Sequence, residues 1–391
     1  MSTNNLHRLF QPASTDKTLL NALTLTADED AILRKARTQV RETLRRDLPR
    51  LIKQALPGIQ TIETPRFITQ GSFAYKTINR HCHPKQQIDM DDGCYLPLSF
   101  AKEFEVGHAS NLFFQAVELV LTPLAKANGW KLVPKDTCTR LEIDSTKHID
   151  IPLYAIPDAD FKKMLMDASV LEYAALKGQV HDHARAVQWS DLPRNKVLLA
   201  IRGGDWRPSD PRPVIRWVEN QVATKTEQWR RLIRYLKAWR DYQWPSGGPT
   251  SICLMAAMDQ VFLRPNAGRD DLALLDIVRR LPQVFAGDIY NPAEPTARPE
   301  DRELLSRRLD EEPGLRRVVQ EKLREFERDL NMAINGNVSP MDACNLVSRH
   351  LGPRIPVRPD WVLVESVAQQ VRSTAPRVSV VAPLIGTTKS G

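Results

Sequence analysis

Apolar side chains recur at helical spacing in the first long segment of the chain. The segment opens with Thr26 and Glu29, which have the spacing of a capping box, so we expect a helix that begins at Thr26. Its core face is expected to carry Ile32, Leu33, Ala36, Val40 and Leu44. Another side carries Arg34, Arg37, Arg41 and Arg45. We expect these arginines to face solvent, and a site for an anionic regulator or for RNA is the alternative.

A mixed pattern of strands and helices occupies the next part of the chain. Strands are predicted at residues 65–70, 87–96, 138–143 and 148–156. Helices are predicted at residues 72–78 and 111–128. The last two strands have the pattern of a hairpin or near-hairpin. Together these elements predict an α+β palm built on a small mixed sheet.

Helical patterns dominate beyond about Asp205. They are predicted at residues 227–242, 251–263, 271–281 and 302–333, with a proline-rich loop at 291–299. We therefore divide the chain into an N-terminal segment (1–25), a mixed core (26–209), a mostly helical domain (210–365) and a flexible tail (373–391).

The length and composition agree with a division into two domains. A chain of 391 residues is too long for one typical core, and 42% hydrophobic with 26% charged residues is typical of a soluble globular protein. No apolar run reaches about 18 residues, so we expect no membrane span. Five cysteines without regular spacing argue against a disulfide framework and predict a cytoplasmic protein. The net charge of +8 favours anionic partners such as nucleotides or nucleic acid.

Three aspartates on the predicted strands are the candidate catalytic groups. Asp89 and Asp91 point to the same face of one strand, about 7 Å apart, because side chains alternate along a strand. Asp150 belongs to another strand, on a face that it shares with His148. Carboxylates placed in this way can bind two Mg²⁺ ions, which is the arrangement of a two-metal nucleotidyl transfer. Asp92 turns to the opposite face, and we expect it to be structural.

A Gly-Ser turn before the first acidic strand is the candidate phosphate site. Gly71 permits a close backbone approach, and a helix that starts at Ser72 points free N–H groups at an anion. Lys237 and Ser251 are candidates to complete a triphosphate site, and Tyr75 is a candidate to stack on a base. Three of these assignments have a structural alternative. Gly71 and Ser72 could form an ordinary turn, Lys237 could lie on a solvated helix face, and Tyr75 could occupy a core or rim position.

Four motifs carry a family resemblance. They are TPRFITQGS at residues 64–72, IDMDDGCYLP at 88–97, KHIDIPLYAIP at 147–157 and LKAWRD at 236–241. Taken together they resemble the DncV-like members of the bacterial CD-NTase family, the cGAS/DncV-like nucleotidyltransferases. The resemblance implies a DNA-polymerase-β-like palm joined to a helical domain.

Roles for individual residues follow from this resemblance. It implies that two Mg²⁺ ions, or Mn²⁺ in their place, are bound by Asp89, Asp91 and Asp150. It implies donor-triphosphate contacts at Gln70, Ser72, Lys237 and Ser251, and base stacking at Tyr75. Contacts to the acceptor nucleotide are implied at Arg140, Ser209 and Asp210. The resemblance also implies that relatives encoded beside an E1/E2-like enzyme are conjugated to cellular targets through a terminal glycine, and Gly391 is the matching candidate.

These features lead to three hypotheses about function. The first is a Mg²⁺-dependent cyclic dinucleotide synthase that makes cyclic GMP-AMP from ATP and GTP. Such a product is a second messenger of bacterial antiphage defence (CBASS) that activates a downstream effector, and nucleic acid is not required. The second is a template-independent nucleotidyltransferase that acts on RNA ends or on protein. The third is a catalytically silent nucleic-acid-binding protein, which the three intact aspartates disfavour.

Overall fold

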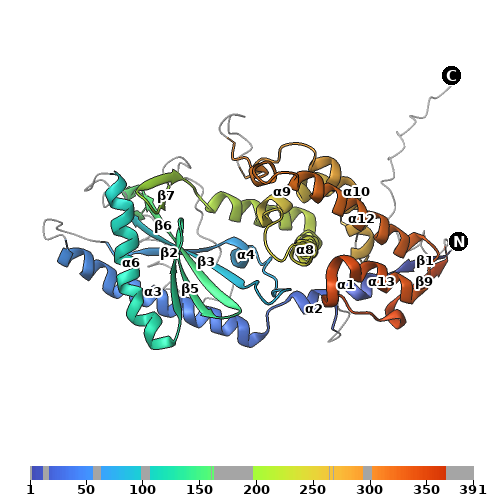
Figure 1. Ribbon diagram of the computed structural model, residues 1–391, viewed down its shortest axis with the longest axis horizontal. Helices are drawn as coiled ribbons and strands as arrows, with labels where there is room; N and C mark the ends of the chain where they lie inside the picture. Colours follow the sequence, from blue (N-terminus) through green and yellow to red (C-terminus); the bar gives the residue numbers. More distant parts are fainter. Residues whose placement is uncertain are drawn as a thin grey trace, which may run out of the picture.

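A computed structural model describes most of the chain. The described residues are 2–11, 17–55, 63–97, 106–159, 161–162, 197–263, 265–266, 268–293 and 302–366. The predicted tail (373–391), Gly391 and most of the proline-rich loop lie outside them. The described residues form helices and one main sheet, so the predicted α+β class is confirmed (Figure 1).

The main sheet has seven strands and contains all four strands predicted from the sequence. Its central path is β2 (Arg66–Gln70), β3 (Ile88–Pro97), β6 (Lys147–Ile156), β5 (Cys138–Asp144) and β4 (Lys131–Pro134). Two further strands extend from β6, namely β7 (Leu198–Ile201) and β8 (Asp205–Pro208). β3 and β6 are parallel, whereas β5 and β6 form the predicted antiparallel hairpin.

Two long helices pack against one face of this sheet. α3 (Ala27–Ala55) and α6 (Val106–Asn128) form a common hydrophobic core with β3 and β6 (Figure 1). The predicted capping box is confirmed, because the Thr26 hydroxyl accepts from Glu29 N over 3.1 Å and the Glu29 carboxylate accepts from Thr26 N over 2.8 Å. The opposite face carries a separate apolar cluster that includes Tyr95 and Tyr154, and polar side chains closer to the start of β3 and β6.

Two of the α3 arginines that were expected to face solvent are bound to the sheet instead. Arg41 forms an ion pair with Asp92, whose side chain is 1% exposed, and its Nε lies 2.7 Å from Asp92 Oδ2. Arg37 donates to Thr69 Oγ1 over 3.1 Å. The solvent-facing expectation is wrong for both arginines, because a buried carboxylate on the sheet requires a cation. The structural role expected for Asp92 is confirmed.

The second half of the chain is mostly helical. Its helices are α8 (Arg212–Gln243), α9 (Ser251–Val261), α10 (Asp270–Val284), α11 (Arg307–Glu311), α12 (Leu315–Asn335) and α13 (Pro340–Leu351). Two short 3₁₀ helices, η3 (Gly352–Arg354) and η4 (Pro359–Trp361), precede β9 (Leu363–Ser366). One large hydrophobic core joins these helices.

Two helix boundaries differ from the sequence predictions. The helix expected over 302–333 is broken between α11 and α12, because Gly314 has φ +77°, a left-handed conformation that ends a helix. In α8 the predicted start at residue 227 is confirmed, because Thr226 has the non-helical φ of +68°, but a further helical segment from Arg212 precedes this kink. The helix expected over 72–78 is only one turn, α4 (Gly71–Ala74), and the chain then turns at Lys76 with φ +57°.

The N-terminal segment packs on the helical part rather than on the palm. β1 (Ser2–Asn5) pairs with β9, and α1 (His7–Phe10) and α2 (Leu19–Leu23) contribute buried side chains to the helical core. The domain boundaries drawn from the sequence stay a prediction. Among the described residues, no helix combines the length and apolar character needed to cross a bilayer.

A buried ion-pair network holds this N-terminal segment in place. Asp271, in the first turn of α10, has no exposed side-chain surface and accepts 3.0 Å hydrogen bonds from Arg269 Nε and Nη2. It also accepts from Leu6 N over 2.8 Å. Arg269 reaches Glu365 on β9 over 3.1 Å. One carboxylate therefore connects the start of the chain, α10 and β9.

Candidate active site

The strand register aligns polar residues in a row across the open face of the sheet. Gln70 on β2 is paired with Asp91 on β3, Asp91 with Asp150 on β6, and Asp150 with Arg140 on β5. Two residues earlier on β3 and β6, Asp89 is paired with His148. Because Met90 is fully buried in the helix-covered core, Asp89 and Asp91 turn to the open face as predicted.

Three of these residues form a candidate metal site. The ligand atoms of Asp89, His148 and Asp150 all lie within 4.8 Å of one another. Asp89 Oδ1 and His148 Nε2 are buried and have no hydrogen-bond partner among the residues described here. A carboxylate oxygen without a partner, beside a second carboxylate, suits a divalent cation. His148 is a member of this group that the sequence hypotheses did not include, although its spacing from Asp150 placed it on the same face.

Asp91 lies against the Gly-Ser turn. A Cβ atom at Gly71 would lie 2.0 Å from Asp91 Oδ2, and Gly71 has φ +63°. Only glycine satisfies both conditions, so the backbone approach expected at this turn is made to a carboxylate of the protein. Burial, followed by the negative charges of Asp89 and Asp150, raises the pKa of Asp91 well above its ordinary value. A bound cation would relieve this repulsion.

Arg140 neutralises Asp150 in this structure. Its Nε and Nη2 lie 2.7 Å and 2.8 Å from the two carboxylate oxygens of Asp150. This bidentate pair fixes the orientation of the carboxylate on β6. The contact of Arg140 with an acceptor nucleotide stays a prediction.

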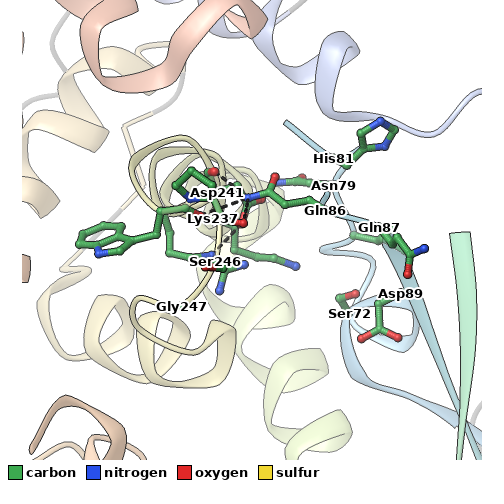
Figure 2. Close-up of a pocket in the computed structure, with 14 residues that line it drawn as sticks. Ser72, Asn79, His81, Gln86, Gln87, Asp89, Lys237, Asp241, Ser246 and Gly247 are labelled. Atoms are coloured by element: carbon green, nitrogen blue, oxygen red, sulfur yellow. Dashed lines mark hydrogen bonds and ion pairs between the residues drawn. The ribbon is translucent and has the colours of Figure 1, made fainter. Parts of the chain in front are cut away.

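A pocket of about 270 Å³ lies between the palm and the end of α8 (Figure 2). Ser72, Gln87 and Asp89 line it on the palm side. The α8 side contributes Lys237, Arg240 and Asp241, and the following loop contributes Pro245, Ser246 and Gly247. Three residues predicted from the sequence therefore meet in one pocket, namely Ser72, Asp89 and Lys237.

Lys237 is a buried cation rather than part of a solvated helix face. Its side chain is 5% exposed, and Nζ donates to the Thr77 carbonyl over 2.8 Å. Burial, then the nearby Arg240, lowers the pKa of Lys237 to about 8. A cation that is already desolvated and close to an acidic cluster is suited to bind an anionic ligand.

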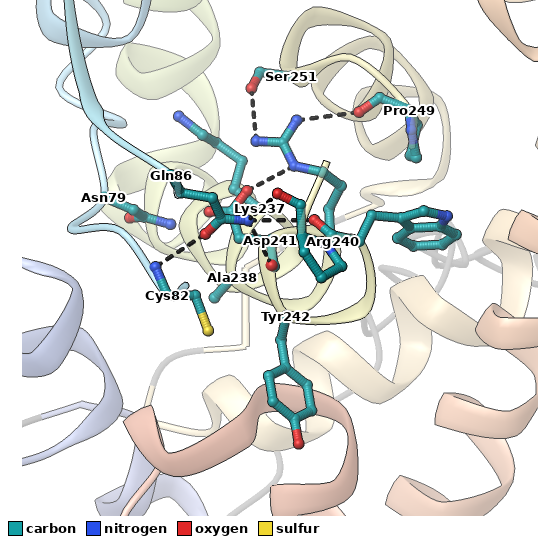
Figure 3. A network of polar contacts seen from close by, with 12 residues as sticks. Asn79, Cys82, Gln86, Lys237, Ala238, Arg240, Asp241, Tyr242, Pro249 and Ser251 are labelled. Atoms are coloured by element: carbon teal, nitrogen blue, oxygen red, sulfur yellow. Dashed lines mark hydrogen bonds and ion pairs between the residues drawn. The ribbon is translucent and has the colours of Figure 1, made fainter. Parts of the chain in front are cut away.

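Arg240, one turn after Lys237 on α8, contacts the predicted Ser251. Its guanidinium donates to the Pro249 carbonyl over 3.1 Å and to Ser251 Oγ over 3.3 Å (Figure 3). It therefore fixes both the loop after α8 and the first residue of α9. The sequence contains no motif that assigns this role to Arg240, because the role depends on how α8 and α9 pack.

The palm caps the C-terminus of α8. The Gln86 amide donates to the Asp241 and Trp244 carbonyls over 2.8 Å and 3.2 Å, and its oxygen accepts from Cys82 N and His83 N (Figure 3). The His83 ring reaches the Tyr242 carbonyl over 3.2 Å. Carbonyls at a helix end lack hydrogen-bond partners within the helix. Here side chains from a distant segment act as those partners. The sequence hypotheses did not include Gln86.

The remaining predicted residues lie away from the pocket lining. Gln70 donates to the Tyr154 hydroxyl over 3.0 Å, and Tyr75 packs against the helical core. Asp210 is ion-paired with Arg212. Ser209 donates its backbone N–H to the Val197 carbonyl. Their nucleotide contacts stay predictions.

Sequence comparisons match families to both sides of the pocket. The family described as "Cyclic GMP-AMP synthase DncV-like, nucleotidyltransferase domain" matches residues 65–154, and "Cyclic GMP-AMP synthase, C-terminal domain" matches residues 226–363. The cyclic GMP-AMP synthase of Vibrio cholerae serotype O1 is 38% identical over 60% of this chain and 56% of its own length. A cyclic GMP-AMP synthase of Escherichia coli shows the same identity and coverage. The chain thus spans little more than half the length of these relatives.

Solved structures are similar over nearly the whole chain. V. cholerae DncV in complex with the linear intermediate 5′ pppA(3′,5′)pG is 26% identical, with a TM-score of 0.75. Its forms bound to 3′-deoxy ATP and 3′-deoxy GTP are 25% identical, with TM-scores of 0.74 and 0.72. Each match covers 94% of this chain and 100% of the other. The agreement confirms the predicted fold, a nucleotidyltransferase palm joined to a helical domain.

Proposed function

We propose that the chain is a DncV-like nucleotidyltransferase that acts as a metal-dependent synthase of a cyclic dinucleotide. The observation that carries the proposal is the cluster of Asp89, Asp91 and Asp150 beside a pocket that contains Lys237. The relatives named cyclic GMP-AMP synthase, and the DncV complexes with adenosine and guanosine nucleotides, favour ATP and GTP as substrates.

The side chains of this site have distinct tasks in such a reaction. Asp89, Asp91 and Asp150 would hold divalent cations, which supply charge neutralisation of the triphosphate and activation of a hydroxyl. Lys237 would bind the phosphates as a buried ammonium group, with Ser72 on the palm side of the same pocket. Arg140 keeps Asp150 in a fixed orientation. Arg240 positions Ser251.

Mass spectrometry of the reaction products tests the proposal directly. The full chain is incubated with all four nucleoside triphosphates and Mg²⁺ or Mn²⁺, with and without added RNA. We expect a cyclic dinucleotide that contains adenosine and guanosine, formed without RNA. Extension of the RNA, or labelling of the protein, would instead support the template-independent nucleotidyltransferase. Salt-dependent nucleic-acid binding without nucleotide turnover would support the silent binding protein.

Replacing Gly71 by alanine is expected to lower product formation roughly 100-fold. The new Cβ would lie 2.0 Å from Asp91 Oδ2, so the carboxylate must move, and a misplacement of about 1 Å can cost roughly that factor. The backbone at φ +63° adds about 1 kcal/mol of destabilisation. Initial rates of product formation and thermal unfolding measure the two effects separately.

Gly129→Ala is the matched control for this variant. Gly129 has φ +68°, but nothing lies within 4 Å of its Cβ position. The control should therefore lose similar stability and keep its activity. Equal activity of the two variants would show that the contact of Gly71 with Asp91 is unimportant.

Replacing Lys237 by methionine is expected to raise the free energy of unfolding at pH 7 by about 2 kcal/mol. A lysine pKa lowered from 10.5 to about 8 corresponds to about 3 kcal/mol, and the lost hydrogen bond to Thr77 offsets about 1 kcal/mol. The unfolded chain binds the proton more tightly, so this cost is fully present below pH 8 and decreases as the pH rises toward 10.5. Urea denaturation at pH 7 and near pH 10 measures the difference.

The same variant should bind nucleoside triphosphate more weakly, because the buried ammonium group is gone. Wild-type affinity should itself fall as the pH rises above about 8. Lys131→Met, at a side chain that is 72% exposed, should change neither stability nor affinity. A Lys237→Met protein with wild-type affinity at pH 7 would remove Lys237 from the proposed site.

We also propose a biological setting for the product. As in the family that the motifs resemble, the cyclic dinucleotide would act as a messenger of antiphage defence (CBASS) and activate a separate effector in the cytoplasm. Conjugation through Gly391 by an E1/E2-like enzyme belongs to the same proposal, and Gly391 lies outside the described residues.

A further inference from the structure

His148 is held between the acidic cluster and a fixed amide. Its residue surface is 5% exposed. Nδ1 lies 2.8 Å from Gln87 Oε1. The Gln87 Nε2 atom faces the carbonyls of Ser145 and Asp144 at 3.3 Å and 3.5 Å. With the amide nitrogen on these carbonyls, the amide oxygen accepts from Nδ1–H, and in the neutral ring the lone pair is on Nε2.

The Nε2 atom of His148 points at two carboxylates. It lies 2.9 Å from Asp89 Oδ1 and 4.0 Å from Asp150 Oδ1. Neither Nε2 nor Asp89 Oδ1 has a hydrogen-bond partner within the described part of the chain. A lone pair that faces carboxylate oxygens without a donor between them is unfavourable, and a cation placed among the three atoms removes the conflict.

The ligand atoms of Asp89, His148 and Asp150 lie within 4.8 Å of one another, so one cation could be held among them. A histidine that binds a metal through one ring nitrogen almost always donates the other N–H to a fixed acceptor, and Gln87 is that acceptor here.

We propose that His148 is a metal ligand of this site, bound through Nε2 and oriented by Gln87. The inference rests on the proposed function, and it makes the site a mixed nitrogen and oxygen donor set rather than one of carboxylates alone. Imidazole suits Zn²⁺, Cu²⁺, Fe²⁺ and Ni²⁺ best, whereas carboxylate and water oxygens suit Mg²⁺ and Mn²⁺. A directly bound imidazole nitrogen would therefore distinguish this site from one of oxygen ligands alone.

Pulsed electron paramagnetic resonance of the full chain loaded with Mn²⁺ alone tests the assignment. We expect ¹⁴N coupling from a directly bound nitrogen in the wild type, and its absence in His148→Leu together with a loss of Mn²⁺ affinity of roughly tenfold or more. His81→Asn is the matched control, because His81 lines the same pocket and is outside the cluster. It should keep the coupling.

A second variant covers the case in which His148→Leu does not fold. Gln87→Leu keeps the ring and frees its orientation, so Mn²⁺ affinity should fall roughly 10- to 100-fold. Mn²⁺ bound without nitrogen coupling in the wild type would overturn the inference and leave the proposed function intact. The same holds for unchanged affinity in both variants. Nitrogen coupling in a protein that makes no nucleotide product would support His148 as a ligand and contradict the proposed function. If Mn²⁺ binds neither alone nor with ATP, the assignment is also wrong.

Discussion

Replacing Asp89 and Asp91 together by asparagine is expected to abolish the cyclic product formed from ATP, GTP and Mg²⁺. Both carboxylates face the open side of the sheet, and Asp89 belongs to the candidate metal group. Metal ions supply several kcal/mol of charge stabilisation in such transfers. Because each 1.4 kcal/mol is a factor of ten in rate, we expect a loss of roughly 1,000-fold or more. The measurement is the rate of product formation by mass spectrometry.

Stability separates this loss of chemistry from a loss of folding. The pKa of Asp91 is raised by burial and by the neighbouring carboxylates, so the folded state holds its proton more tightly than the unfolded chain does. Ionised Asp91 therefore destabilises the fold as the pH rises above its ordinary pKa, and asparagine relieves this cost at pH 7. The double variant should melt at the same temperature as the wild type or higher. Asp310→Asn, at a side chain that is 51% exposed, should keep full activity. Undiminished product from the double variant would remove the two aspartates from the active site.

Replacing Asp271 by asparagine is expected to destabilise the helical part by about 3–5 kcal/mol. The ion pair with Arg269 is almost fully buried, and breaking a buried pair typically costs this amount, even though Arg269 keeps its contact with Glu365. The variant also weakens the contact with Leu6 N, through which the N-terminal segment is attached to α10. Urea denaturation followed by tryptophan fluorescence measures the effect, because Trp229 and Trp239 lie in the same core.

Asp276→Asn on the same helix is the matched control. Its side chain is 45% exposed and pairs with Arg280 one turn away, so the change should cost less than about 0.5 kcal/mol. Equal effects at the two positions would mean that burial of the Asp271 pair contributes nothing. A second readout is limited proteolysis, which should cleave the Asp271→Asn protein first near its N-terminus.

Local patterns explain which parts of the fold could be predicted. The capping box at Thr26 and the alternation around Met90 depend on neighbouring residues only, and both are confirmed. The break before α12 was also visible in the sequence as Pro313-Gly314, a strong turn signal that a long helical pattern outweighed. The helix after the kink at Thr226 was predicted, whereas the segment of α8 before the kink was not.

Contacts between distant segments explain what could not be predicted. Arg41 was assigned to solvent because nothing in the helix shows that a buried carboxylate lies opposite it. The link from Leu6 to Asp271 joins residues 265 positions apart. In the site, strand alternation was enough to find the aspartates, whereas Gln86 and Arg240 act through the end of α8, whose position depends on tertiary packing.

The capping of α8 by the palm bears on how proteins of this kind can be recombined. Gln86 precedes the strand of Asp89 and bonds to carbonyls at the end of the helix that carries Lys237. A crossover placed between the palm and α8 would separate the carbonyls at the end of α8 from the side chains that donate hydrogen bonds to them. This loss would occur even if each half folded well. Grafting a new palm onto this chain should therefore transfer the loop with Gln86 and the end of α8 as one cassette. The Asn79 amide also donates to the Arg234 carbonyl over 2.9 Å, so residues 79–86 and 234–244 contain these hydrogen bonds together.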